Sequence, residues 1–375
     1  MEHSSKPLRV VLAGGGTAGH VNPLLATASE LKRRGVHVSA VGTAEGLEAD
    51  LVPAAGIELD TIERVPFPRR PNGAMMRFPG KFRAALSHAG EILHTRQADV
   101  VVGFGGFVST PMYQAAKRRG VPVVIHEQNA KQGLANRYGA RFAQAVALTF
   151  PSTSLVAKKG QTLTIGLPLR PAIAELAAAR LNGEAAERAR AAQLLGLDPD
   201  MVTLVVTGGS LGALHLNEVL EQCLPLLHDV QVLHLTGRGK DGPIRAAAAS
   251  MPHYHVLDYL SAMENAYAVA DLVLCRSGAG TVAELSALGI PAFFVPLAIG
   301  NGEQELNAAD SIRAGGAELV RDKDFDSQVF SQRVMPLLTS PSRLTEMGRV
   351  ARGVSPVDAA ARLADLIISV GKARQ

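Results

Sequence analysis

Residues 8–20 read Leu-Arg-Val-Val-Leu-Ala-Gly-Gly-Gly-Thr-Ala-Gly-His, an apolar run that leads directly into a glycine-rich turn. A helix-like pattern follows over residues 22–32. About half a chain later, an apolar run at 203–207 and the turn Gly-Gly-Ser-Leu-Gly at 208–212 repeat this order. Because such turns present backbone N–H groups to phosphate or sugar ligands, the repeat predicts two α/β domains that face one cleft.

The alternation of β-type and helix-type runs extends over the whole chain. In the first half, strands are predicted at 8–13, 37–41, 57–62, 100–103, 121–125 and 145–149. After Pro168 and Pro171 the pattern restarts, with strands at 203–207, 230–235, 255–259, 272–275 and 292–295. We therefore predict an α/β chain with two Rossmann-like domains, residues 1–166 and 167–353. An amphipathic helix within 354–375 is expected to pack back on the first domain.

Composition narrows the class of protein. The 375 residues are 47% hydrophobic and 19% charged, which favours a folded, soluble protein over a disordered one. We expect no transmembrane helix, because no apolar run reaches about 18 residues, and no secretory signal, because residues 1–6 are polar. Cys223 and Cys275 lack the spacing of metal ligands and fit a reduced cytoplasm.

Charge is distributed unevenly between the two halves. Residues 1–170 carry 21 Lys and Arg against 11 Asp and Glu, whereas residues 171–375 carry 17 against 23. A basic first half suggests an anionic partner, such as a nucleic acid or a phospholipid surface. The acidic second half argues against a protein devoted wholly to nucleic acid.

The first glycine turn matches the dinucleotide-binding pattern G-x-G-x-x-G between a strand and a helix. That pattern also requires an acidic residue at the tip of the second strand. This chain has Val-Gly-Thr there, at 41–43, and Glu45 and Glu48 come only later. We therefore do not expect NAD or FAD. A tight turn alone would explain the glycines but would leave Thr17 and His20 unexplained.

The segment Arg-Ser-Gly-Ala-Gly-Thr-Val-Ala-Glu at 276–284 follows a predicted strand and opens a helix. Free N–H groups and the helix dipole at such a start can bind a pyrophosphate without a metal. Glu284, one turn inside, could accept hydrogen bonds from ribose hydroxyls. A capping box between Thr281 and Glu284 explains the same spacing equally well.

Two further loops follow predicted strands of the first half. His-Glu-Gln-Asn at 126–129 lies at the carboxyl end of a strand, where α/β sheets place ligand-binding groups. A structural role for His126 is the alternative. Gly-Phe-Gly-Gly-Phe-Val-Ser at 103–109 could cradle a phosphate with backbone donors, or it could be an ordinary loop.

Basic and apolar side chains alternate between Arg64 and Arg83, where prolines and Gly73 are expected to prevent one long helix. This mixture favours an interfacial anchor for an anionic membrane leaflet. A solvated loop is the alternative, and RNA binding lacks a supporting signature. The residues assigned to the membrane surface are Phe67, Arg69, Arg70, Met75, Met76, Arg77, Phe78, Lys81 and Phe82.

Together with Gly-Leu-Pro-Leu-Arg at 166–170 and Gln304 with Asn307, these motifs resemble the peptidoglycan lipid-II-forming N-acetylglucosaminyltransferases from about residue 10 to 308. The resemblance implies the GT-B fold and transfer of N-acetylglucosamine (GlcNAc) from UDP-GlcNAc to lipid I, the undecaprenyl-diphosphate-linked MurNAc-pentapeptide. It also implies peripheral attachment to the cytoplasmic side of the cell membrane, cell-wall or division proteins as partners, and no nucleic acid.

The resemblance also implies roles for individual residues. Ala18, Phe107 and Glu303 depart from the residues that the family commonly has at these positions. The glycine loops would meet the acceptor phosphate through Gly14, Gly15, Gly103, Gly105 and Gly106. Contacts to the donor are expected from Thr17, Ala18, Gly19, Asn129, Arg170, Ser210, Leu260, Ala279, Gly280, Thr281, Val282, Ala283, Glu284 and Gln304.

The chemistry expected is inverting glycosyl transfer, which needs a base for the acceptor 4-hydroxyl. His20 is the first candidate, because imidazole titrates near neutral pH. Glu127 is the second, as a base or as a partner of His126. The helix start at 279–281 and Arg170 would stabilise the leaving diphosphate, so we expect no metal and no cofactor.

Three other functions fit parts of the sequence. A related transferase with a soluble acceptor would share the site but bind no membrane. A UDP-GlcNAc 2-epimerase would consume the donor without an acceptor. A non-catalytic nucleotide-binding regulator would bind UDP and release none.

Overall fold

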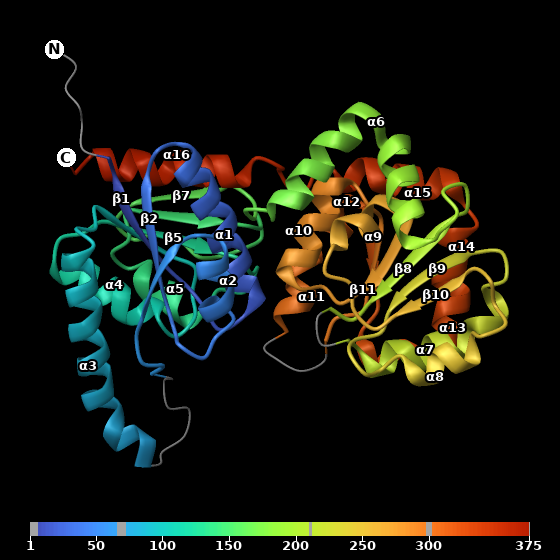
Figure 1. Cartoon of the computed structure of the whole chain (residues 1–375), viewed down its shortest axis with the longest axis horizontal. Helices are drawn as coiled ribbons and strands as arrows, with labels where there is room; N and C mark the ends of the chain where they lie inside the picture. The colour runs from blue at the N-terminus through green and yellow to red at the C-terminus, as the bar shows by residue number, and fades with distance from the viewer. Residues whose placement is uncertain (1–6, 66–72, 210–211, 298–301, 375) are drawn as a thin grey trace. The chain divides into compact units, whose positions relative to one another are not determined.

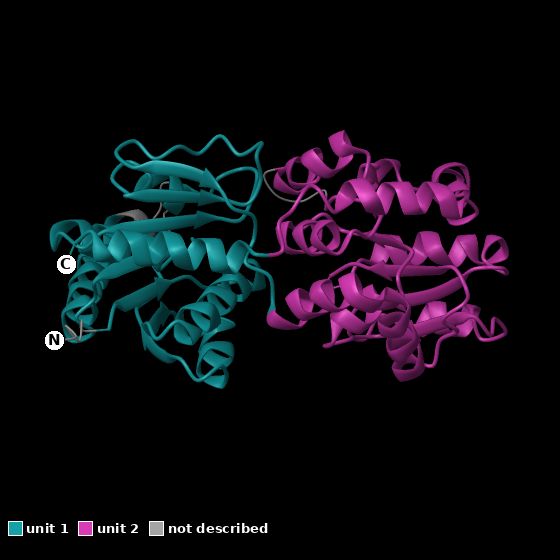
Figure 2. Ribbon diagram, turned by 90° about the horizontal axis from the view of Figure 1, so that it is seen from above, with its two compact units in different colours: residues 1–170, 358–375 teal, residues 171–357 magenta. Residues whose placement is uncertain are grey.

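The computed structural model describes residues 7–65, 73–209, 212–297 and 302–374, without the side chains of 73–75. The chain divides into two compact units, one of residues 1–170 with 358–375 and one of residues 171–357 (Figure 2). The division after Arg170 lies four residues beyond the boundary that the sequence predicts. The C-terminal segment belongs to the first unit.

The first unit is built on a seven-stranded parallel sheet with the order β3-β2-β1-β4-β5-β6-β7 (Figure 1). The edge strand β7 was not predicted, because Gln-Thr-Leu-Thr is short and largely exposed. The strands are β1 (Arg9–Ala13), β2 (His37–Gly42), β3 (Glu58–Thr61), β4 (Val100–Gly103), β5 (Val123–Glu127), β6 (Ala145–Leu148) and β7 (Gln161–Thr164).

Helices cover both faces of this sheet. The C-terminal helix α16 packs against α1 and buries Leu363 and Ile367 in one cluster with Leu12 and Val100, as the sequence predicts. In Figure 1 it lies along the same face as α1. The helices are α1 (Ala18–Arg33), α2 (Glu48–Ala54), α3 (Gly73–Thr95), α4 (Ser109–Arg118), α5 (Leu134–Gly139) and α16 (Ala359–Lys372).

Helix α3 corrects one expectation. Gly73 and Pro79 do not prevent a long helix, since α3 runs over 23 residues and includes both. Pro79 removes one backbone donor, and in this exposed part of the helix water can satisfy the carbonyl that is left over. Within the ranges that the structure describes, no helix is long and apolar enough to cross a membrane.

The second unit has a six-stranded parallel sheet with the order β10-β9-β8-β11-β12-β13. The three-residue edge strand β13 gave too little signal to be predicted. The strands are β8 (Thr203–Thr207), β9 (Gln231–Leu235), β10 (Tyr254–Leu257), β11 (Leu272–Cys275), β12 (Ala292–Phe294) and β13 (Ala317–Leu319).

Helix α6 opens the second unit and is interrupted at Gly183. A second core gathers aliphatic residues of β8, β9 and β11 with Phe293, Phe325 and Phe330. The helices are α6 (Pro171–Leu195), α7 (Leu214–Cys223), α8 (Gly242–Ala247), α9 (Met263–Val269), α10 (Ala279–Leu288), α11 (Glu303–Asn307), α12 (Ala309–Ala314), α13 (Ser327–Val329), α14 (Met335–Leu338) and α15 (Pro341–Ala351). Shorter helical turns are Leu224–Leu226, Asp322–Asp324 and Phe330–Val334.

Candidate active site

Each sheet reverses its strand order at one point, between β1 and β4 in the first unit and between β8 and β11 in the second. In open α/β sheets, ligands bind at the carboxyl ends of the strands beside this switch point. The loops there are 14–17 and 104–108 in the first unit, and 208–213 and 276–278 in the second. Four of the motifs singled out in the sequence therefore lie at the two switch points, two in each unit.

The turn after β1 is held by a carboxylate from its own unit. Glu48, the first residue of α2, is fully buried and accepts hydrogen bonds from the N–H of Gly16 at 2.8 Å and of Thr43 at 2.9 Å. The Thr43 hydroxyl donates a third, at 2.8 Å. Gly16 needs its flexibility, because its φ is +86°. The N–H of Gly14 is donated to the Val41 carbonyl at 3.3 Å, so it is not free for an acceptor phosphate.

His20 lies in the first turn of α1, half-buried beside this loop. Its Nδ1 is 3.1 Å from the Gly15 carbonyl oxygen and 3.1 Å from Thr17 Oγ1. A carbonyl can only accept, so we assign the proton of the neutral imidazole to Nδ1, which leaves the lone pair on Nε2. Burial lowers the pKa of His20, and the Gly15 carbonyl and the Glu48 charge oppose that effect. A neutral imidazole with its lone pair on Nε2 can take a proton.

The loop after β4 packs directly on the first turn. A methyl group at Gly106 would lie 2.7 Å from the Gly15 carbonyl oxygen, and one at Gly105 would lie 3.1 Å from His20 Nε2. Ser109 Oγ donates to the carbonyls of Gly105, at 2.7 Å, and Ala13, at 3.1 Å. The loop therefore forms a wall of backbone beside His20 Nε2. Gly103 has a packing role, because a methyl group there would overlap the ring of Tyr113.

Glu127 lies at the end of β5 and is buried. Its carboxylate accepts hydrogen bonds from the N–H of Asn129 at 3.1 Å, the N–H of Gly133 at 3.0 Å and the Asn136 amide at 3.0 Å. These contacts hold the loop that leads to α5. A role for Glu127 as base stays a prediction.

His126 points to the other face of the sheet from Glu127, because neighbouring strand residues alternate. Its Nε2 is 2.9 Å from the Gly166 carbonyl oxygen, and its Nδ1 is 3.1 Å from the Gln128 amide nitrogen. Full burial lowers the pKa of His126 to about 4. The geometry therefore favours the structural alternative for this histidine over a pairing with Glu127.

In the second unit, the best-defined ligand-facing element is the start of α10. Its N-cap is Gly278, which has no side chain with which to cap the helix. The capping-box alternative is therefore wrong, because Thr281 lies inside the helix instead of at its N-cap. Ser277 is fully buried, and its Oγ has no hydrogen-bond partner among the described residues. The N–H groups at the start of α10 can donate hydrogen bonds to a bound anion.

The predicted donor-binding side chains on α10 are buried to different degrees. Glu284 is 8% exposed. Val282 and Ala283 are buried in the core, so any donor contact from them would come from the backbone. Gln304 accepts the Leu297 N–H at 2.8 Å and so joins α11 to the end of β12.

The remaining predicted contacts are placed as follows. Thr17, Ala18 and Gly19 are exposed at the start of α1, and Asn129, Arg170 and Leu260 are half-buried. Ser210 lies outside the described residues, between Gly209 and Gly212 of the turn after β8. Glu48 and Asn136 were not expected at the site, and Ser277 lies in the predicted segment 276–284 but was given no role of its own. The late position of Glu48 after the second strand was the one signal for it.

The surface of α3 carries most of the predicted membrane residues. Met76 is 87% exposed, Arg77 is exposed, and the half-buried rings of Phe78 and Phe82 stack 5.6 Å apart. Lys81 forms an ion pair with Glu63. Phe67, Arg69, Arg70 and the side chain of Met75 lie outside the described residues.

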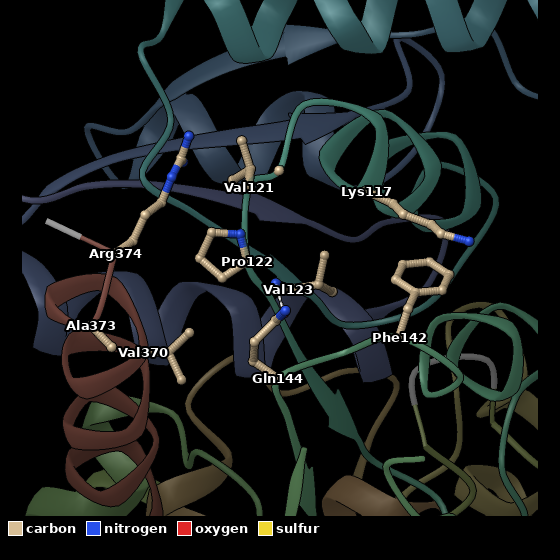
Figure 3. A pocket seen from close by; sticks show the side chains of 10 residues that line it. Lys117, Val121, Pro122, Val123, Phe142, Gln144, Val370, Ala373 and Arg374 are labelled. Atoms are coloured by element: carbon tan, nitrogen blue, oxygen red, sulfur yellow. Dashed lines mark hydrogen bonds between the residues drawn. The ribbon is translucent and has the colours of Figure 1, made fainter. Parts of the chain in front are cut away.

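A cavity of about 290 Å³ lies elsewhere in the first unit, beside the amino end of β5 (Figure 3). Lys117 packs over the Phe142 ring, 5.0 Å from its centre, and Arg374 donates to the Ala98 carbonyl at 3.0 Å. The cavity lies at the amino end of β5, whereas His20 follows the carboxyl end of β1. The cavity is therefore separate from the candidate site.

The two doubly wound units, each with glycine-rich loops at its switch point, have the architecture of the GT-B fold of glycosyltransferases. The chain belongs to glycosyltransferase family 28. The model of the glycosyltransferase family 28 N-terminal domain matches residues 10–148. The model of the family's C-terminal domain matches residues 203–365.

Relatives match along almost the whole chain. The UDP-N-acetylglucosamine--N-acetylmuramyl-(pentapeptide) pyrophosphoryl-undecaprenol N-acetylglucosamine transferase of Paenarthrobacter aurescens is 50% identical over 98% of this chain and 97% of its own. The enzyme of the same name from Bifidobacterium longum is 48% identical over 91% and 92%.

Solved structures agree with this placement. The crystal structure of Acinetobacter baumannii MurG has a TM-score of 0.79 at 32% identity, over 97% of this chain and 100% of that one. A UDP-GlcNAc 2-epimerase from Neisseria meningitidis has a TM-score of 0.70 at 12% identity, over 96% and 99%. At that identity, the second likeness concerns the fold alone.

Proposed function

We propose that this enzyme transfers GlcNAc from UDP-GlcNAc to the 4-hydroxyl of MurNAc in lipid I and so forms lipid II for peptidoglycan. The observation that carries this conclusion is the 50% identity, over nearly the full length, to a transferase named for that reaction. The reaction is a hexosyl transfer, and lipid I and UDP-GlcNAc are its two substrates.

The donor diphosphate is assigned to the start of α10. Uncapped N–H groups and the helix dipole favour a negative group there without a metal. Ser277 supplies a buried hydroxyl without a described partner beneath this turn. Glu284 and Gln304 would hold the ribose and sugar hydroxyls. As UDP leaves, the same N–H groups stabilise the charge on its phosphate.

The acceptor is assigned to the first unit, with His20 as its base. The acceptor oxygen bonds to the anomeric carbon as the bond from that carbon to the phosphate oxygen breaks and its electron pair leaves with UDP. The hydroxyl proton passes to His20 Nε2, whose lone pair the Gly15 carbonyl leaves free by binding Nδ1–H.

Peripheral membrane attachment is assigned to α3 and its groove with α4. Arg83, Arg118 and Arg119 line that groove with a single carboxylate, Glu91. None of the three arginines has an ion-pair partner among the described residues. Arg77 follows exposed Met76 near the start of α3. Basic side chains near an anionic leaflet contribute roughly 1 kcal/mol each to binding. Sedimentation with anionic vesicles should therefore exceed that with neutral ones, and Arg118→Gln with Arg119→Gln should reduce it. Equal sedimentation with both vesicle types would refute this attachment.

UDP release from UDP-GlcNAc in EDTA, with and without a short-chain lipid I analogue, tests the proposed reaction. Release only with the analogue, together with a disaccharide product, is the expected result and would also establish metal independence. Consumption of the donor without the analogue would indicate an epimerase. Restoration of activity by a divalent ion would contradict metal independence alone.

A further inference from the structure

We propose that Glu48 is a positioning residue for His20, given the proposed transferase function. Its buried carboxylate holds the Gly15–Gly16 peptide so that the Gly15 carbonyl binds His20 Nδ1–H. Its charge then stabilises the imidazolium that forms when Nε2 takes the acceptor proton.

The turn is shaped around this carboxylate. A methyl group added at Gly15, Gly42 or Gly46 would lie 2.2, 2.3 or 2.2 Å from the nearest side-chain atom of Glu48. Three glycines, in the turn after β1, at the end of β2 and in the loop after β2, thus leave room for one buried side chain. Side chains larger than hydrogen at these positions would displace it.

The charge of Glu48 is bound but not neutralised. Burial raises the pKa of this carboxyl, but the N–H groups of Gly16 and Thr43 and the Thr43 hydroxyl outweigh that effect, and the net pKa is lowered. Glu48 is therefore ionised at neutral pH. No lysine or arginine of the described residues forms an ion pair with it.

One peptide group joins the carboxylate to the histidine. The N–H of Gly16 donates to Glu48 at 2.8 Å, and the carbonyl of Gly15, in the same peptide unit, lies 3.1 Å from His20 Nδ1. A hydrogen bond to the carboxylate polarises this peptide and makes its carbonyl a stronger acceptor. As Nε2 gains a proton, the imidazolium is then stabilised through both the carbonyl and the charge behind it.

Among the residues that the structure describes, the other groups in contact with His20 are neutral. Thr17 contributes a hydroxyl from the N-cap of α1, and Gly105 contributes backbone from the loop after β4. From α5, the Asn136 amide approaches the same Gly105. Glu48 of α2 is the ionised residue among the described neighbours named here. Its negative charge therefore raises the pKa of His20.

The test is Glu48→Gln in the full-length enzyme, with Glu45→Gln as the matched control. Glu45 is exposed in the loop before α2, three residues from Glu48. Without the charge, the pKa of His20 falls, so the acid limb of the kcat–pH profile should move to lower pH by about one unit. Because His20 becomes a weaker base, kcat on the plateau should fall about tenfold. Glu48→Asp, which keeps the charge, should restore the position of the limb.

Two readouts do not depend on activity. NMR titration of His20 should show the same downward shift in Glu48→Gln and none in Glu45→Gln. In the unmodified enzyme, ¹⁵N shifts should show neutral His20 protonated at Nδ1. Both hold if lipid I proves to be the wrong acceptor, so failure of the proposed function and failure of this inference are distinguishable.

Three results would overturn the inference. One is an unchanged His20 titration in a folded Glu48→Gln variant. Another is a slower enzyme whose acid limb has not moved, since that would assign Glu48 a purely structural role. The third is a neutral His20 protonated at Nε2, which would remove the peptide connection even if the glutamine variant does not fold.

Discussion

The turn after β1 and the turn after β11 share the same order of strand, glycine-rich turn and helix. Their backbone N–H groups nevertheless have different partners. In the first, Glu48 already accepts the N–H of Gly16. In the second, the N-cap Gly278 has no side chain to cap α10, and Ser277 Oγ lacks a hydrogen-bond partner among the described residues. A glycine-rich turn therefore does not by itself bind phosphate. In our proposal, the internal carboxylate of Glu48 makes one such loop a support for His20, the proposed base.

The largest expected effect separates chemistry from binding. His20→Ala should lower kcat by about 10²–10⁴, because a general base contributes that much. The Kd for UDP should stay unchanged, because we assign UDP to the second unit. Steady-state kinetics with UDP calorimetry would check both. A kcat near that of the unmodified enzyme would mean that another group is the base.

Acidic pH should lower the folding stability of both units, because each buries a histidine. Burial lowers the pKa of His126 to about 4 and of His234 to about 3. Below an unfolded pKa of about 6.5, the unfolded chain binds protons that the folded chain does not. Stability should therefore fall as pH drops from about 6.5 towards 4, by up to roughly 3 kcal/mol for each histidine.

Denaturant titrations across this pH range would measure the loss. His126→Asn and His234→Asn should each flatten the profile, in the first and second unit respectively. If the slope is unchanged in both variants, these histidines are not its source.

Adding a methyl group should affect the two turns differently. Gly15→Ala would place carbon 2.2 Å from the Glu48 carboxylate, whereas a methyl at Gly280 meets nothing within 4 Å. The first change should cost about 1–3 kcal/mol of unfolding free energy. The second should cost nothing or stabilise slightly, because alanine favours helix over glycine. Unfolding midpoints of the two variants would measure the difference, and equal losses would contradict it.

The smallest expected effect is on donor affinity. Glu284→Ala should raise KM for UDP-GlcNAc about tenfold, the loss expected for hydrogen bonds to a charged group. kcat should change less, since no bond at Glu284 breaks. Glu346→Gln, an exposed change on α15 of the same unit, is the control. A lower kcat with an unchanged KM would contradict the assignment of Glu284 to the ribose.

Sequence reasoning identified the elements with strong local signals. Apolar runs such as those of β8 and β11 predict central strands, and the loops that follow such strands locate both switch points. The strands β7 and β13 were missed because they are short edge strands. Pro79 misled us about α3, since the cost of one lost donor depends on exposure that a sequence does not show.

The role of Glu48 lay beyond the sequence for a different reason. It reaches back 32 residues to the turn through α2, and only the fold brings them together. The sequence showed instead that no acid stands at the strand tip. Two further features depend on three-dimensional neighbours. They are the buried Ser277 hydroxyl, which has no partner among the described residues, and the hydrogen bonds of Glu127.

Amide NMR of the ¹⁵N-labelled full-length enzyme during titration with UDP tests the difference between the two turns most directly. Our account predicts large shifts for the N–H groups of residues 279–281 at the start of α10. It predicts little change for Gly16, whose N–H stays with Glu48. A shift of the Gly16 amide as large as those at 279–281, or no shift at 279–281, would contradict it.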